Sequence, residues 1–120
     1  LIVAANSLLI AETVALAEQA GVDARLLAPA LAGGFADSLP FQILTPRMAE
    51  RRFEPVQWKV QTLLKDLGNA IALGQTMDSS LPLATAAHTL MQRHADQGFA
   101  CDDLSSTVLL HASPSAAEQD

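Results

Sequence analysis

The stretch that decides the fold is Trp58-Lys-Val-Gln-Thr-Leu-Leu-Lys-Asp-Leu-Gly-Asn-Ala-Ile-Ala-Leu-Gly74, which has the period of an amphipathic helix. Plotted at about 100° per residue, one side collects the apolar side chains Val60, Leu63, Leu64, Leu67, Ala70 and Ile71. Another side carries polar and aromatic residues, which are Trp58, Gln61, Lys65 and Asn69. The spacing therefore predicts a firmly anchored helix over 58–74 that lines up an aromatic ring, an ammonium and two amides.

Periodicity leaves two interpretations of Lys65 open. An ammonium held beside an aromatic residue and small residues can pair with a carboxylate, a phosphate or a dinucleotide. An ordinary amphipathic helix also carries solvated lysines on its outer face, and the pattern alone does not separate the two.

Composition limits the class of protein. The 120 residues are enough for one domain with a single core, and half of them are apolar, with few aromatics and no Tyr. Ala and Leu dominate, which favours close-packed helices over a β-sandwich. The net charge of −6, with no basic cluster beyond Arg51-Arg52, disfavours nucleic acid or an anionic membrane as the partner. The single cysteine, Cys101, provides no disulfide framework, so we expect a reducing, cytoplasmic setting.

The chain opens with a nearly all-apolar segment, for which we predict a helix over residues 1–20, closed by Gly21. It begins without a capping residue, so we expect the sequence to be a fragment cut inside a longer helix. Asp23 is the predicted cap of a short helix over 24–32.

A second capping residue, Ser38, opens the next predicted helix, which runs to about Arg51. The residue before a proline avoids the helical region, so we expect an interruption near Thr45-Pro46.

Two further helices complete the chain. The first opens at Leu81-Pro82 and ends at Gly98. Its predicted inner stripe is Leu83, Ala86, Ala87, Leu90, Met91 and His94. The second begins at Asp102-Asp103 and runs to about His111, and the small, acidic segment 112–120 is predicted to be disordered. With no segment of strand period, the fold class is all-α, a bundle of about five to six helices over 1–111.

Catalytic motifs are absent from the sequence. Gly33-Gly34 follows no strand and lacks the G-x-G-x-x-G spacing of a phosphate loop. His88, His94 and His111 include no i,i+4 pair, so we predict no metal site and expect exposed or helix-end histidines. A nucleophile at Cys101 needs a partner that the sequence does not place.

Several motifs follow one another in a distinctive order along almost the whole chain. They are the Glu12 helix ending in Leu-Ala-Glu-Gln-Ala-Gly21-Val, Met48 ahead of Phe53-x-Pro55, Trp58 seven residues before Lys65-Asp66-Leu67-Gly-Asn-Ala, then Leu81-Pro82-Leu83, Gly98 and Asp103-x-Ser105. In this order the chain resembles the C-terminal helical domain of the β-hydroxyacid dehydrogenases, the family of 3-hydroxyisobutyrate dehydrogenase and tartronate semialdehyde reductase. The fold implied is the helical domain of a 6-phosphogluconate-dehydrogenase-like enzyme.

The resemblance implies a two-domain oxidoreductase. A Rossmann domain, absent from this chain, would hold NAD or NADP, and the helical domain 1–111 would close over a small β-hydroxy acid or its semialdehyde. The nearly all-apolar first helix should be covered by another subunit or by neighbouring helices, so we expect a homo-oligomer formed through the helical domains. The family's catalytic lysine would lie upstream of Leu1, so no catalytic residue falls in this chain, and the chain alone is expected to be inactive.

The resemblance also assigns site residues. Lys65 would be the family's second lysine, which reaches the cofactor, and Trp58 would take the place of an aromatic, usually phenylalanine, beside the nicotinamide and the substrate. Asp66, also on the cofactor-binding side, would orient the lysine or cap the polar network of the cleft. The helical stripe adds Gln61 and Asn69 as candidates for the substrate cleft.

Two other classes of function stay open from the residues alone. A non-catalytic helical interaction or dimerisation module explains the Ala- and Leu-rich helices, although not the ordered motifs around Lys65. A histidine phosphotransfer bundle would use His88 or His94, but neither has the acidic and basic neighbours that this chemistry needs.

Overall fold

The structure, a computed structural model, describes residues 1–111, so the prediction of a disordered segment over 112–120 lies outside the described residues. The elements are α1 (Ile2–Gln19), η1 (Ala24–Leu26), α2 (Leu27–Leu31), α3 (Leu39–Ala49), α4 (Val60–Thr76), α5 (Pro82–His94), η2 (Ala95–Phe99) and η3 (Leu104–His111). Over residues 1–111 there is no strand, which confirms the predicted all-α bundle.

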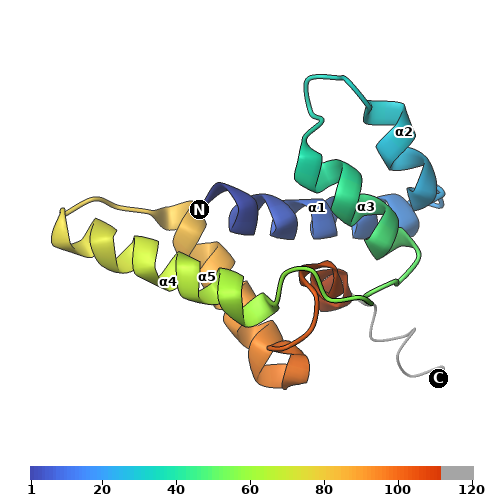
Figure 1. The fold of residues 1–120 in the computed structure, drawn as a ribbon. Helices are drawn as coiled ribbons and strands as arrows, with labels where there is room; N and C mark the ends of the chain where they lie inside the picture. Colours follow the sequence, from blue (N-terminus) through green and yellow to red (C-terminus); the bar gives the residue numbers. More distant parts are fainter. Residues whose placement is uncertain (112–120) are drawn as a thin grey trace.

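Helix α1 is the central element (Figure 1). Helices α3 and η3 pack against it, while α4 and α5 pack against each other and α5 returns to contact α1. The common core is built from aliphatic side chains of every large helix, with Leu8, Val14, Leu44, Met48, Leu67, Met91, Leu104 and Val108 among its members. The pair α4–α5 therefore packs near one end of α1, and α2 with α3 lies near the other end (Figure 1).

Because α1 is apolar nearly all round, it has more apolar surface than the core uses. One face of α1 is buried, whereas Ile2, Leu9 and Leu16 remain well exposed. In length and composition α1 is also the one helix within 1–111 that could cross a membrane, but core helices of soluble proteins meet the same criteria.

Predicted helix ends are confirmed where a glycine or a capping side chain marks them. Gly21 follows α1 with a positive φ angle of 80°, which a glycine adopts without strain. Gly98 also has a positive φ angle, of 106°, but it lies inside η2 and does not end α5. Asp23 Oδ1 accepts the backbone N–H two residues later at 3.0 Å, and Ser38 Oγ accepts the N–H three residues later at 3.1 Å.

The predicted interruption at Thr45-Pro46 is wrong, because α3 continues without a break to Ala49. Pro46 removes one helical hydrogen bond. Leu44 and Met48, on either side of it, are almost fully buried in the core. We infer that this packing outweighs the lost bond and keeps the helix continuous.

The predicted inner stripe of α5 is partly wrong. Leu83 is 82% exposed and Ala86 is exposed as well, whereas Ala84 faces the core together with Ala87, Met91 and His94. The helix also ends at His94 instead of about Gln97, and η2 follows it. A helix with apolar residues on two faces does not reveal from its period which face is buried.

His94 is the end residue of α5 and is buried, so both its place at a helix end and its place in the predicted inner stripe are confirmed. Its Nε2 lies 2.9 Å from Ser106 Oγ, and its ring stacks on Phe99 with 4.3 Å between centroids. Burial lowers the pKa of His94 to about 4, although the charge of Asp102 acts in the opposite direction. The imidazole is therefore neutral in the folded protein at neutral pH.

We expect the stability of the chain to fall as the pH drops from 6.5 to about 4. In this window the unfolded chain protonates His94 and the folded chain does not, and the total loss is about 3 kcal/mol. Well above pH 6.5 His94 is neutral in both the folded and the unfolded chain, so it contributes no pH dependence there. Urea unfolding at about pH 7 and about pH 4.5 measures the loss. His94→Gln should lose much less between the two conditions, and an equal loss would contradict the account.

Candidate functional site

Helix α4 presents two distinct faces. Val60, Leu63 and Leu67 are buried, and the exposed side carries Gln61, Lys65, Asp66 and Asn69. The predicted stripe is thus confirmed for the two amides and the ammonium, which lie on the side away from the core. It is wrong for Trp58, because α4 begins at Val60 and not at Trp58.

Lys65 is an exposed residue of α4, and one carboxylate, that of Asp66, is adjacent to it in the chain. No salt bridge within the described residues includes it, and the positions one turn before and one turn after it carry the amides Gln61 and Asn69. Asp66, the adjacent residue, is exposed and forms no salt bridge within 1–111 either. The ammonium is therefore free to pair with an external anion.

Trp58 lies on the approach to α4 and is 43% exposed. It covers a hollow of about 140 Å³ whose other lining residues are all apolar, namely Val3, Leu39, Pro40, Ile43, Leu44 and Leu104. Lys65 and the two amides do not line this hollow. The structure thus places Trp58 against α1, α3 and η3, on the segment that leads into α4.

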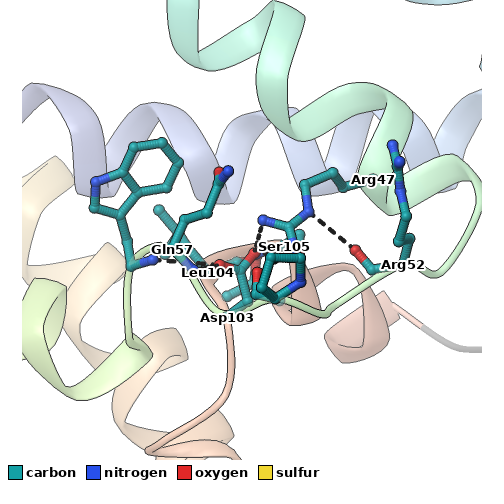
Figure 2. A network of polar contacts seen from close by, with 9 residues as sticks. Arg47, Arg52, Gln57, Asp103, Leu104 and Ser105 are labelled. Atoms are coloured by element: carbon teal, nitrogen blue, oxygen red, sulfur yellow. Dashed lines mark hydrogen bonds and ion pairs between the residues drawn. The ribbon is translucent and has the colours of Figure 1, made fainter.

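A buried polar network, which the sequence did not reveal, fixes the segment before α4 (Figure 2). Asp103 is fully buried, and its Oδ1 accepts the backbone N–H groups of Gln57 at 2.8 Å and Trp58 at 3.3 Å. Its Oδ2 accepts the Ser105 N–H at 3.0 Å and also the Ser105 hydroxyl. One carboxylate therefore ties η3 to the approach to α4.

Arg47 of α3 is the positive partner of this carboxylate, with Nη1 3.3 Å from Asp103 Oδ2 (Figure 2). Its Nε donates to the Arg52 carbonyl at 3.1 Å, and its Nη2 donates to the Pro55 carbonyl at 2.6 Å. The Arg47 side chain is 7% exposed. Its guanidinium therefore neutralises a buried charge and also donates to two loop carbonyls that have no helical partner.

The same contacts set the ionisation of Asp103. Burial alone would raise the pKa of this carboxyl, but hydrogen bonds from the Ser105 hydroxyl and from the N–H groups of Gln57, Ser105 and Trp58 outweigh burial and hold the pKa below its usual value. Asp103 is therefore charged at neutral pH. The sequence carried one signal of the pair, because Arg47 stands between Leu44 and Met48 on the apolar face of α3 and needs an acidic partner there.

Metal ligands and Cys101 are the other candidate catalytic groups within residues 1–111. No three His, Cys, Asp or Glu side chains gather there in an arrangement that could hold a metal ion. Cys101 is exposed, and its Sγ lies 4.0 Å from Gln61 Oε1, which is not a base that could activate it.

Residues 1–111 match the family model described as NAD-binding of NADP-dependent 3-hydroxyisobutyrate dehydrogenase. A curated protein of Bacillus subtilis, the uncharacterized oxidoreductase YkwC, is 30% identical over 96 residues, which are 80% of this chain and 33% of that protein. The chain thus spans about a third of the length of this curated relative.

Two solved structures share the fold. One is 3-hydroxyisobutyrate dehydrogenase (ygbJ) from Salmonella typhimurium, with a TM-score of 0.83 at 20% identity, covering 89% of this chain and 37% of that one. The other is Mycobacterium tuberculosis 3-hydroxyisobutyrate dehydrogenase with L-serine, with a TM-score of 0.79 at 22% identity, covering 93% of this chain and 40% of that one. At these identities the likeness concerns the fold.

Proposed function

Because this chain belongs to the NAD-binding family of NADP-dependent 3-hydroxyisobutyrate dehydrogenase, we propose that it is the C-terminal helical domain of an NAD(P)-dependent oxidoreductase. The reaction moves a hydride between nicotinamide and a small β-hydroxy acid or its semialdehyde. The length of the curated relative supports a second domain, which would hold most of the cofactor. L-serine, named with the M. tuberculosis enzyme, carries a hydroxyl on its β-carbon and fits the proposed substrate class.

The observation that carries this proposal is the ammonium of Lys65 on the exposed face of α4, which forms no salt bridge within residues 1–111. A dinucleotide presents phosphate oxygens, and a hydroxy acid presents a carboxylate, so either can supply a counter-charge. The amides of Gln61 and Asn69 flank the ammonium and can donate further hydrogen bonds. The exposed face of α4 can therefore form one wall of a cleft whose other wall is a nucleotide-binding domain.

Three residues of this chain have separate roles in the proposed cleft. When bound, the nicotinamide supplies or accepts the hydride. Lys65 contributes fixed positive charge that binds and orients the cofactor, with Asp66 beside it, and Trp58 shields the nicotinamide and substrate side from water. The proton donor lies on the part of the enzyme outside this chain, so the chain alone is expected to be inactive.

We propose that the intact enzyme assembles through α1 and α5. Apolar hollows of about 340 and 270 Å³ lie along these two helices, and their lining includes Leu1, Ile2, Ala5, Leu8, Leu9, Pro82, Leu83, Ala86 and Leu90. An apolar surface of this extent fits a subunit interface.

Leu9→Asp should therefore dissociate the oligomer, because it places a charge on the proposed interface. Sedimentation velocity of the full-length enzyme measures the effect. Leu26→Asp is the matched control, since Leu26 on η1 is 59% exposed, as Leu9 is. The same sedimentation coefficient for Leu9→Asp and the control would contradict an interface at this place.

The proposed reaction is tested with the full-length enzyme. A panel of small β-hydroxy acids is offered with NAD⁺ and with NADP⁺, and reduction of the cofactor is followed by absorbance. We expect turnover with at least one acid. No reduction of either cofactor across the panel would instead favour a non-catalytic interaction module. A cytoplasmic location stays a prediction.

A further inference from the structure

We propose that Arg47 and Asp103 are positioning residues that fix Trp58 at the edge of the cofactor and substrate cleft. The identity of the cleft rests on the proposed function, whereas the hold on Trp58 rests on contacts within this chain.

The peptide groups around Trp58 are held on both sides. The N–H of Trp58 donates to Asp103 Oδ1, and the carbonyl of Trp58 accepts the N–H of Leu104 at 2.8 Å. The neighbouring N–H of Gln57 donates to the same carboxylate oxygen. The backbone before the indole is therefore fastened to η3 and has little freedom to shift.

Arg47 holds the earlier part of the same loop. Its two hydrogen bonds reach the carbonyls of Arg52 and Pro55, and its third nitrogen faces the carboxylate of Asp103 (Figure 2). An arginine can make these contacts simultaneously because its guanidinium is a rigid planar fork, which a lysine does not have. The charged pair thus holds the loop over 52–58 at both ends, Arg47 through two carbonyls and Asp103 through two N–H groups.

The start of α4 does not depend on this carboxylate. The N–H of Val60 donates to the Asp102 carbonyl at 3.0 Å, and the N–H of Gln61 donates to the Ala100 carbonyl at 2.9 Å. Loss of the Asp103 charge should therefore loosen Trp58 while the helix that carries Lys65 stays in place. In the proposed cleft, a loosened Trp58 should weaken binding of the substrate, whereas binding of the cofactor by Lys65 should change little.

The test uses the full-length enzyme with 5-fluorotryptophan incorporated, compared as wild type, Asp103→Asn and Met91→Ala. Trp58 is the one tryptophan of this chain, and Trp58→Phe identifies its ¹⁹F resonance. Met91 is fully buried on α5 and provides a destabilising control away from the loop. All measurements are made at a temperature where each variant is folded.

We expect Asp103→Asn to shift or broaden the Trp58 resonance and Met91→Ala to leave it unchanged. The KM for the hydroxy acid should rise and kcat/KM should fall about tenfold, because small misplacements in a site are costly. The KM for the cofactor should change less than about twofold. A merely structural role lowers the active fraction, and hence the apparent kcat, without changing either KM.

An unchanged Trp58 resonance in Asp103→Asn would overturn the proposal, as would a fall in apparent kcat with both KM values unchanged. If Asp103→Asn fails to fold, Arg47→Lys replaces it, because this variant keeps the charge beside Asp103 and loses the fork. If the wild type reduces neither cofactor, the proposed function fails, and the ¹⁹F comparison still decides whether the pair positions Trp58.

Discussion

Asp103→Ala is expected to lower the free energy of unfolding of this chain by about 3–5 kcal/mol. The substitution leaves the Arg47 guanidinium buried without a counter-charge and removes the acceptor of three backbone N–H groups. A small domain has a stability of about 5–15 kcal/mol, so this is one of the largest effects that a single substitution can have here. Urea unfolding followed by circular dichroism measures it.

Two comparisons separate the buried pair from ordinary ion pairing. Glu50→Ala removes the partner of Arg52 from an exposed pair, whose side chains are 47% and 58% exposed, and should cost less than about 1 kcal/mol. The double variant Arg47→Met, Asp103→Leu should cost less than the sum of its single variants, because it removes both buried charges. If Asp103→Ala costs no more than Glu50→Ala, the network does not stabilise the fold.

Lys65→Ala in the full-length enzyme is expected to raise the KM for the cofactor about 10- to 100-fold. The loss corresponds to one charge-assisted hydrogen bond, which contributes about 1.5–3 kcal/mol. Lys65 is exposed and bears no salt bridge within 1–111, so the folded state should tolerate its removal. Initial-rate kinetics at saturating hydroxy acid, with unfolding measured in parallel, check both statements.

The matched control is Lys59→Ala, since Lys59 and Lys65 are the two lysines of this chain and both are exposed. Lys59→Ala changes the net charge by the same amount and should leave the KM for the cofactor within about twofold. The reason is that Lys59 lies before the start of α4 and not on the exposed face that carries Lys65. Equal effects of the two substitutions would mean that overall charge, and not the place of Lys65, controls cofactor binding.

The features predicted correctly from the sequence are those that depend on a few neighbouring residues. Gly21, Asp23 and Ser38 mark helix ends because capping uses backbone groups within one turn. The outward face of α4, with Lys65 and Asn69, follows from a period that has only one apolar side.

The features that the sequence did not predict depend on packing between distant segments. The continuity of α3 through Pro46 depends on burial against the core, and local preference alone argued for a break. The face of α5 on which Leu83 lies is decided by what α1 and α4 leave uncovered. The pairing of Arg47 with Asp103 joins α3 to η3, and no spacing rule connects two such separate segments.

The most direct measurement of the central claim is chemical labelling of lysine amines in the full-length enzyme, read by mass spectrometry with and without a saturating cofactor. Lys65 should be protected severalfold by NAD⁺ or NADP⁺, whereas Lys59 serves as the internal reference and should react equally in both samples. Equal labelling of Lys65 with and without bound cofactor would contradict the claim that its amine faces the nucleotide.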